Sequence, residues 1–299
     1  MKDNKILVIV VTYNAMKWAD RCFSSLISSS IPLDIYVVDN GSTDGTQDFI
    51  NTRFPNITIN QSERNLGFGR ANNLGLQYAL DNGYNYVYLL NQDAWLFPDT
   101  IEKLIDVSKK YPEFEILSPF QINSNGRIDK YFLINVCSWK SNPDLLNDLY
   151  NKQVNDVYSV TNVMAAHWFL PISTIKKIGG FSPSFPHYGE DDNYIDRSLF
   201  KGGKVGIVPS LRVVHDRSSR VDTIDKNIYI GYIDSIKLLS DPSIKTFYAL
   251  LQALHISLTN SLAYKSIKPI IKYCSLLFQI REIINNKRES VVKERAFLE

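Results

Sequence analysis

The sequence predicts a doubly wound, Rossmann-like α/β fold, in which helices flank a mostly parallel central sheet, with a helical appendage at the C-terminal end. Two observations support this fold class. Short apolar runs alternate with segments of helical periodicity through the first 120 residues, which is typical of a parallel sheet with crossover helices. The chain has 299 residues and is 44% hydrophobic, enough for a sizeable core.

The apolar runs are rich in Val, Ile and Tyr and do not alternate with polar residues. Strands that are covered on both faces have this composition. We therefore expect strands at residues 5–11, 33–39, 56–60, 86–91 and 115–119.

Helical periodicity separates several of these strands. Apolar side chains recur on one face of 16–29 and of 70–82, and a third helix is expected at 98–110. Pro98 would occupy the first helical position of that third helix, where its missing N–H costs nothing.

The alternation of apolar runs with helical segments ends near residue 120. Residues 126–140 and 157–171 are expected to form antiparallel or edge strands, separated by the polar stretch 141–156. A short helix at 173–178 would be capped by Ser173 and ended by Gly179-Gly180. A further helix opens at "GEDDNYIDR", two short strands follow within 204–215, and the chain is helical from 222 onward. We therefore divide the chain into domains 1–220 and 221–299.

The C-terminal region has an unusual surface. Residues 264–299 hold eight Lys/Arg and four Glu, a net charge of +4. Residues 246–264 contain no Asp, Glu, Lys or Arg, but their polar side chains make a poor bilayer span. In 267–284 the polar residues form one narrow stripe, so the apolar remainder must meet the domain itself, a second copy in a homodimer, or a membrane surface. The pattern favours packing or dimerisation.

Composition narrows the class of protein. A net charge of +2 over the whole chain argues against nucleic acid as a partner. Three widely spaced cysteines form no CxxC pair, which argues against a disulfide framework or a zinc site and favours a reduced, cytoplasmic compartment. The N-terminal apolar run is too short to span a bilayer and lacks a small-residue cleavage site, so it reads as a buried strand.

Polar residues follow three of the expected strands. Ligands of open α/β sheets bind beyond the carboxyl ends of the strands, so these positions are candidate binding residues. Taken singly, such clusters are ordinary turns, and "DNGSTDGT" alone favours a turn. The residues are Thr12, Tyr13 and Asn14 after the first strand, Asp39, Asn40, Ser42 and Asp44 after the second, and Asn91, Gln92, Asp93 and Trp95 after the fourth.

The sequence lacks the other common nucleotide-binding motifs. "GFGRAN" has Asn72 where a dinucleotide fingerprint needs its third glycine, which weakens an NAD-dependent oxidoreductase. No GK[ST] loop is present, which excludes a P-loop protein. The segment "VVTYNAMKW" also lacks the glycine-rich basic loop of a sugar nucleotidyltransferase.

Six motifs occur in a fixed order: "VTYN", "VVDNGSTDGT", "NLGFGRANNLGL", "LLNQDAWL", "HYGEDDNYIDR" and "VVHD". Over residues 5–220 this series resembles the inverting glycosyltransferases of family 2, which have the GT-A fold. Within that family it resembles rhamnosyltransferase-type and other bacterial enzymes of cell-surface polysaccharide synthesis. The resemblance implies that residues 1–220 form a nucleotide-sugar-binding and catalytic domain.

The resemblance also implies a donor site. Thr12, Tyr13 and Asp39 match positions that hold the base and ribose of a nucleoside-diphosphate sugar, of the dTDP-rhamnose or UDP-hexose type. The neighbouring donor-site positions are Asn14, Asn40, Ser42, Asp44, Arg70, Asn91 and Gln92.

"Asn91-Gln92-Asp93" stands where the family has its DxD element, which grips a divalent ion on the donor diphosphate. Asp93 and His215 are the implied ligands, and oxygen donors suit Mg²⁺ or Mn²⁺. Asn91 replaces the first acid of that element.

The acidic triplet 190–192 matches the family's base motif. The resemblance assigns Asp191 as the general base that removes a proton from the acceptor hydroxyl. Asn193 replaces the family's second acid after this pair, so Glu190 or Asp192 could share the role of base. Glu190, Asp192, Trp95, His167 and Trp168 are expected on the acceptor side, while Arg197, Arg217 and Arg220 are candidates for phosphate contact.

The sequence therefore predicts a metal-dependent, inverting transfer of a sugar to a saccharide or lipid-linked acceptor. Asn91 and Asn193 motivate one alternative, a scaffold or sugar-binding subunit that keeps the fold without turnover.

Overall fold

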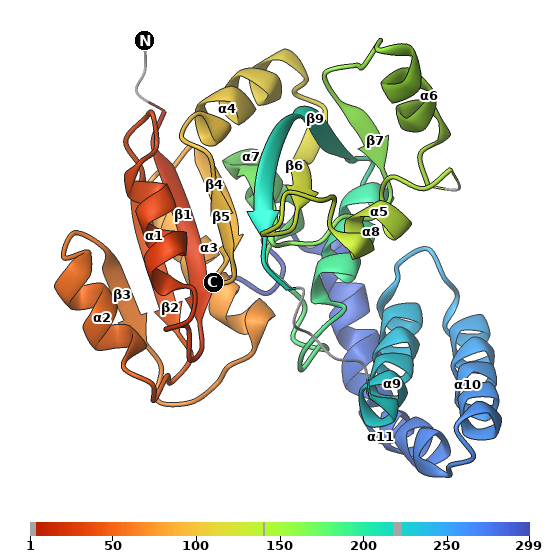
Figure 1. Ribbon diagram of the computed structural model, residues 1–299. Helices are drawn as coiled ribbons and strands as arrows, with labels where there is room; N and C mark the ends of the chain where they lie inside the picture. The colour runs from red at the N-terminus through yellow and green to blue at the C-terminus, as the bar shows by residue number, and fades with distance from the viewer. Residues whose placement is uncertain (1–3, 140, 218–222) are drawn as a thin grey trace.

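A computed structural model describes residues 4–139, 141–217 and 223–299. Arg220 and the expected domain boundary at 220–221 lie outside these residues. Within them, nine strands form one mixed sheet in the order β3-β2-β1-β4-β8-β6-β9-β5, with β7 beside β9 (Figure 1).

The first half of the sheet is parallel, as the apolar runs predict. Its strands are β1 (Ile6–Thr12), β2 (Asp34–Asp39), β3 (Thr58–Gln61) and β4 (Tyr86–Asn91). Their carboxyl ends meet at one edge of the sheet, so the polar residues after β1, β2 and β4 come together there.

The second half is mixed. β8 (His167–Pro171) runs antiparallel to β4 and to β6 (Phe114–Ile122). β9 (Lys204–His215) is parallel to β6 and antiparallel to β5 (Ala94–Leu96) and β7 (Tyr158–Val160). The prediction of two short strands within 204–215 is wrong, because a register shift between Pro119 and Phe120 lets one bent strand continue beside β6.

Helices cover both faces of the parallel half. α1 (Ala19–Ile27) and α4 (Thr100–Lys110) share a core with Ile6, Val8 and Val10 of β1. α3 (Phe68–Asp81) packs on the other face, against Leu7 and Ile9. α2 (Thr46–Arg53) follows β2. Pro98 does not begin α4, because Asp99 is the N-cap and Pro98 precedes it.

The prediction of a strand at 126–140 is wrong, because the described residues of this segment contain a helix. Asp129 accepts a hydrogen bond from the backbone N–H of Phe132 and caps α5 (Lys130–Asn135). Asn142 caps α6 (Pro143–Asn151) in the same way, through the N–H of Leu145. The expected strand at 157–171 is confirmed as β7 and β8.

The helices that lead to the base motif also follow the sequence, except for one cap. α7 (Ile172–Ile178) has Pro171 as its N-cap, so Ser173 lies inside the helix and does not cap it. Gly179 ends α7, and α8 (Glu190–Phe200) begins after Gly189.

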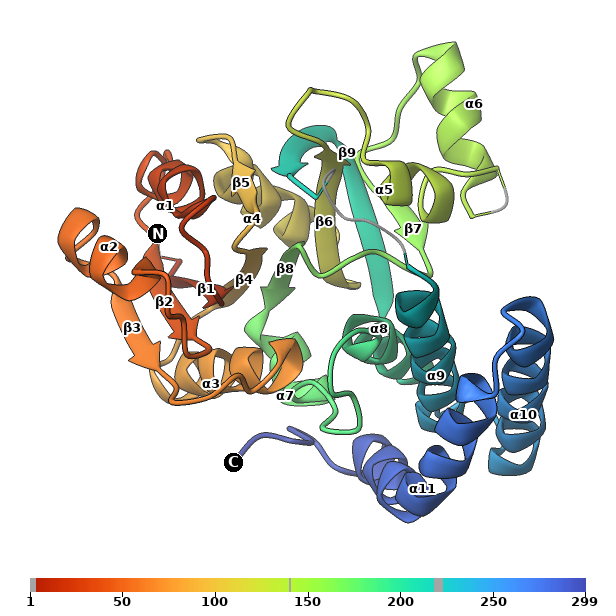
Figure 2. The same cartoon turned by 60° about the horizontal axis from the view of Figure 1, so that its bottom comes forward.

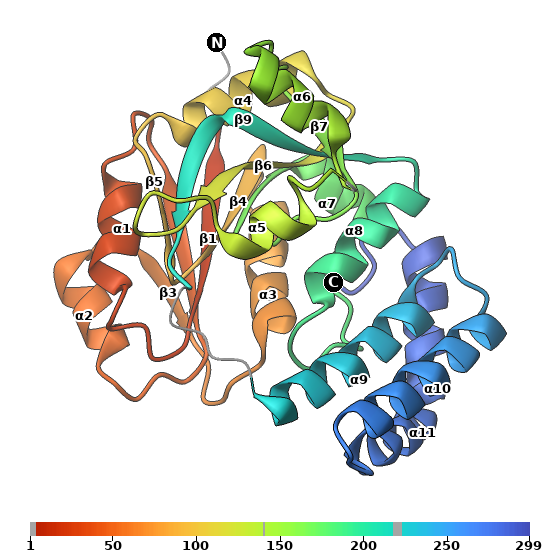
Figure 3. The same cartoon turned by 45° about the vertical axis from the view of Figure 1, so that its right-hand side comes forward.

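The described C-terminal residues fold into α9 (Ile224–Ser240), α10 (Thr246–Ala263) and α11 (Lys268–Val292), which pack side by side (Figures 1 and 3). The prediction of helix from 222 onward is wrong for residues 293–299, where the chain leaves α11 and returns to the sheet domain near α3 and α7 (Figure 2). Gly180 N–H donates to the carbonyl of Ala296, and Leu298 joins the main core. Among the described helices, none is long and apolar enough to cross a membrane.

Candidate active site

The loops after β1 and β2 are joined through the Asp39 carboxylate. It accepts hydrogen bonds from the hydroxyls of Thr12 (2.7 Å) and Ser42 (2.6 Å), from the Gln47 amide (2.5 Å), and from the N–H groups of Gly41 and Ser42. Burial raises the pKa of Asp39, but these hydrogen bonds outweigh burial and hold the pKa below its usual range. Asp39 is therefore ionised at neutral pH.

Further contacts shape the same edge. Tyr13 N–H donates to the Gln92 side chain (2.7 Å), and Gln92 donates back to the Tyr13 carbonyl (3.2 Å). Asn14 links the two loops, since its N–H donates to the Ser42 hydroxyl (2.9 Å) and its side-chain oxygen accepts from Thr43 N–H (2.9 Å). Asp44 accepts from Met16 N–H at 3.1 Å. Tyr13 is 48% exposed and can offer a ring face to a base.

Asn40 connects this edge to α3. Its amide oxygen accepts from Leu66 N–H and its amide nitrogen donates to the Gly67 carbonyl. Arg70 lies exposed in the first turn of α3. The structure thus brings the predicted donor-site residues to one edge of the sheet.

The two expected metal ligands are also adjacent. β5 pairs with β9 so that Ala94 lies opposite His215, and Asp216 N–H donates to the Asp93 carbonyl. His215 Nε2 lies 3.4 Å from Asp93 Oδ1, and both residues are buried. Within the described residues, neither ring nitrogen of His215 has a hydrogen-bond partner. A buried imidazole with open nitrogens beside a carboxylate fits a divalent ion.

A complete protein cage for a metal is not present in the described part of the chain. No three His, Cys, Asp or Glu side chains gather there in positions to hold an ion. Asp93 and His215 would therefore supply only part of the coordination shell of a divalent ion.

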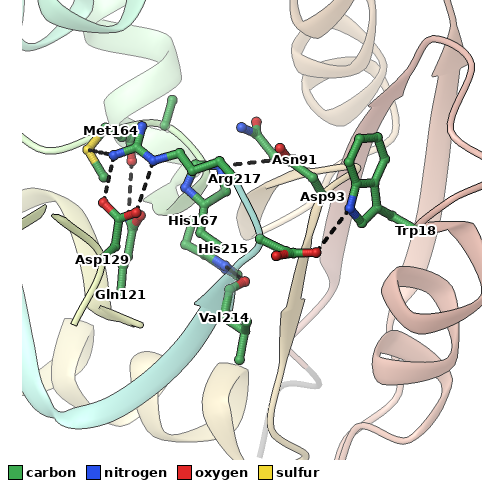
Figure 4. Close-up of polar contacts among 12 residues, drawn as sticks. Trp18, Asn91, Asp93, Gln121, Asp129, Met164, His167, Val214, His215 and Arg217 are labelled. Atoms are coloured by element: carbon green, nitrogen blue, oxygen red, sulfur yellow. Dashed lines mark hydrogen bonds and ion pairs between the residues drawn. The ribbon is translucent and has the colours of Figure 1, made fainter. Parts of the chain in front are cut away.

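His167 and Trp168 lie beneath the site. His167 Nε2 donates to the Val214 carbonyl (3.0 Å, Figure 4), so its Nδ1 accepts from the Tyr88 hydroxyl (2.8 Å). Burial lowers the pKa of His167 to about 3, so the ring stays neutral. Trp168 is fully buried, stacks on Phe181 and donates to the Val163 carbonyl.

Because His167 and Trp168 are buried, neither side chain has an exposed face on which a sugar could pack. Trp95 is half-buried, with the Arg21 guanidinium 5.4 Å from its ring centroid.

The acidic triplet opens α8. The left-handed conformation of Gly189 (φ 82°) turns the chain into the helix, and all three acids stand in its first turn. Burial and the charge of Asp191 raise the pKa of Glu190 to about 8. Loss of solvation and the charge of Asp192 raise the pKa of Asp191 to about 6. Two neighbouring acids therefore titrate near neutrality, which suits proton transfer.

A cavity of about 730 Å³ connects these groups. Asn91 and His215 line one part of it, and the acidic triplet lines another. α9 supplies one wall, which sequence reasoning missed because 221–299 carries no family motif. Its residues there are Lys226, Asn227, Ile230, Ile233, Asp234 and Lys237.

The arginines have structural partners. Arg217 makes a bidentate ion pair with Asp129, at 2.6 and 3.0 Å, and contacts the sulfur of Met164 (Figure 4). Arg197 is buried in α8 and donates to the carbonyls of Ile178 and Gly180. Arg197 therefore holds the turn after α7, and a contact with phosphate is not expected.

An α/β sheet with polar loops after β1 and β2, an acid–histidine pair after β4 and three acids at the start of α8 matches the arrangement expected of a GT-A fold. The sequence profile described as "Glycosyl transferase family 2" matches residues 7–165, more than half of the chain. The protein belongs to glycosyl transferase family 2.

Known proteins agree with this assignment. The chain is similar to N-acetylglucosaminyl-diphospho-decaprenol L-rhamnosyltransferase of Mycobacterium tuberculosis, 26% identical over 76% of this chain and 83% of that protein. It is 24% identical to a chondroitin synthase of Escherichia coli over 74% of this chain but only 30% of that protein. The crystal structure of S. aureus TarS 1–349 in complex with UDP-GlcNAc superposes with a TM-score of 0.60. That match has 17% identity and covers 96% and 84% of the two chains, so it shows the fold alone.

Proposed function

We propose that the protein is a metal-dependent, inverting glycosyltransferase that moves a sugar from a nucleoside-diphosphate sugar to a saccharide or lipid-linked acceptor. One observation carries the proposal: His215, Asn91 and Asp191 line the same cavity of about 730 Å³. Groups suited to a donor diphosphate and a group suited to an acceptor hydroxyl thus face one space.

In this proposal each group of residues has a separate role. Tyr13 and Asp39 would hold the base and ribose of the donor. A divalent ion held by Asp93 and His215 would offset the negative charge that develops on the leaving diphosphate. The Asp191 carboxylate takes the proton of the acceptor hydroxyl, because it is ionised above about pH 6 and lies in the cavity. A single displacement with one base inverts the anomeric centre.

Glu190 is our candidate for contact with the acceptor. It is 4% exposed, and in the described structure its Oε2 has no hydrogen-bond partner. A buried carboxyl that is protonated at neutral pH can donate a hydrogen bond to a sugar oxygen.

The comparisons support a choice of substrates. The M. tuberculosis relative is a rhamnosyltransferase that acts on a lipid diphosphate carrying N-acetylglucosamine, by its name. We therefore propose dTDP-rhamnose as the first donor to test and a lipid-linked saccharide of the cell surface as the acceptor. A UDP-hexose is the second donor, because the TarS structure holds UDP-GlcNAc.

Nucleotide binding tests the donor site. Calorimetry with UDP, dTDP, GDP and ADP, each with and without Mn²⁺, should show one nucleotide that binds tightly only with metal. Asp93→Ala and His215→Ala should abolish the tight binding that Mn²⁺ produces. Asp48→Ala, a change at an exposed residue of α2, should leave it unchanged. Binding of none of the four by folded protein would favour the scaffold alternative.

Turnover tests the base. Asp191→Asn should abolish transfer and donor hydrolysis while nucleotide binding persists. Hydrolysis that is unaffected by Asp191→Asn would show that the base is elsewhere. Proton NMR of the first product should show an anomeric configuration opposite to that of the donor.

We also propose that α10 and α11 rest on an anionic lipid surface. Both helices keep large apolar side chains in solvent, among them Phe247 (68% exposed), Leu262 (81%) and Phe278 (91%). The exposed lysines Lys245 and Lys265 flank the uncharged helix α10, and lysine is attracted to anionic headgroups.

Vesicle co-sedimentation tests this contact. Phe278→Glu should reduce binding to anionic vesicles, whereas Tyr150→Glu on α6, an aromatic residue 88% exposed, should leave it unchanged. A concentration-dependent dimer in solution, with no vesicle binding, would assign the face to a second copy instead.

A further inference from the structure

α9 places a lysine directly against the acidic triplet. Lys237 Nζ lies 2.7 Å from Asp192 Oδ2 and 3.4 Å from Asp234 Oδ1. The other oxygen of Asp192 accepts a hydrogen bond from the Asn162 side chain. Both oxygens of Asp192 are therefore occupied by protein groups.

Asp191 is held in a different way. Its Oδ1 accepts from the backbone N–H of Asp192 (3.0 Å) and its Oδ2 from that of Ala165 (3.4 Å). Each carboxylate oxygen can accept a second hydrogen bond. Among the described residues, Asp191 is held only by neutral backbone N–H groups and can still accept from a substrate hydroxyl, whereas Asp192 is held by two side chains, one of them the charged Lys237, which tie it to α9 and to the loop before β8.

We propose that Lys237 is a positioning residue for the catalytic base: by pairing with Asp192 it balances one charge of the triplet and leaves Asp191 alone to accept the proton. This inference rests on the proposed function of Asp191. It also gives the C-terminal region a role in catalysis, because Lys237 comes from α9.

The charges around Asp191 define what Lys237 does. Glu190 and Asp192 share its helix, Lys237 and Asp234 face the triplet from α9, and Tyr131 faces it from α5. Arg217 is nearby but is committed to its bidentate pair with Asp129.

Removal of Lys237 therefore leaves the charge of Asp192 unbalanced beside Asp191. Like charges disfavour ionisation, so Asp191 would bind its proton more tightly. Conversely, removal of the Asp192 charge should weaken the affinity of Asp191 for its proton.

The test is the pH dependence of kcat/KM in the full-length enzyme. Lys237→Met should move the acidic limb upward by roughly 0.5 to 1 pH unit. Lys237→Arg, which keeps the positive charge, should leave the limb at its wild-type position. At pH values below the limb, such a shift lowers kcat/KM by about three- to tenfold, and the loss should vanish at high pH. Lys204→Met, at an exposed lysine paired with Glu113, is the control and should leave the profile unchanged.

Asp192→Asn provides a second, independent reading. Asparagine keeps the shape of the side chain, and the acidic limb should move downward. In the double variant Asp192→Asn/Lys237→Met the upward shift should disappear, because the charge that Lys237 balances is gone.

Two results would overturn the inference. One is a limb that stays in place in Lys237→Met while Asp191→Asn is inactive. The other is a loss of activity in Lys237→Met that is equal at every pH, which would indicate a purely structural contact. Full activity in Asp191→Asn would instead overturn the proposed function itself.

Discussion

Gly189 offers a direct test of how α9 meets the base motif. It is the N-cap of α8, with φ 82° and ψ −9°, and Gly45 is the N-cap of α2 with nearly the same angles, φ 87° and ψ 7°. Alanine at either position strains the backbone by about 1 kcal/mol. At Gly45 a new Cβ has no described atom within 4 Å, whereas at Gly189 it would lie 2.7 Å from Ile233 Cγ2.

The difference between the two variants measures this overlap. Overpacking typically costs ~1–3 kcal/mol, so Gly45→Ala should lower the free energy of unfolding by ~1 kcal/mol and Gly189→Ala by ~3 kcal/mol. Denaturation in urea, followed by circular dichroism, gives both values from the midpoint and slope.

A double-mutant cycle identifies the atom responsible. Ile233→Ala alone should cost ~2–4 kcal/mol, because Ile233 is 2% exposed in the core under α9. In that background the methyl group at Cγ2 is absent and only the Lys237 side chain, with Cγ and Cδ 3.2 Å from the new Cβ, must give way. Gly189→Ala should then cost ~1–2 kcal/mol, a coupling of ~1–2 kcal/mol. Equal costs for Gly189→Ala and Gly45→Ala, or a coupling below ~0.5 kcal/mol, would refute the packing of α9 on the base loop.

Three further predictions concern single side chains. Asp39→Asn should destabilise the protein by ~2 kcal/mol and weaken nucleotide binding, since an amide N–H₂ replaces an acceptor that faces only donors; exposed Asp48→Asn is the control for both urea denaturation and calorimetry. Glu190→Gln should gain stability over wild type as pH rises from about 4.5 to about 8, by roughly 1 kcal/mol per pH unit, because in this range the folded state keeps the Glu190 proton that the unfolded state has released, so rising pH disfavours folding of wild type alone. The same comparison for exposed Glu63→Gln should give a flat difference, and a flat difference for Glu190→Gln would show that its carboxyl is well solvated. Leu298→Ala should cost ~2–3 kcal/mol in thermal or urea unfolding, whereas Leu262→Ala, at a leucine 81% exposed, should cost less than ~0.5 kcal/mol; similar values would mean that the segment after α11 does not dock.

Several elements followed from local patterns. The strands β1 to β4 and the helices α1, α3 and α8 were predictable because each depends on hydrophobic period and on nearby punctuation. The segment 130–135 was not, since its apolar residues suit a strand and only the cap at Asp129 selects the helix.

The sequence by itself determined the class of the protein and the edge of the sheet where its chemistry lies. Polar residues after β1, β2 and β4 stand next to their strands in the chain, and parallel pairing gathers them without further information. The ordered motifs identified the family for the same reason, since each motif is local.

Only the tertiary structure decided which of these side chains line the cavity. It buried His167 and Trp168 on β8 in the middle of the sheet, paired His215 with Asp93, and brought Lys237 of α9 onto Asp192 of α8. Such contacts join residues that are far apart in the sequence, and they depend on how whole elements pack. Local hydrophobic periodicity records which face of a helix is buried but not which partner covers it.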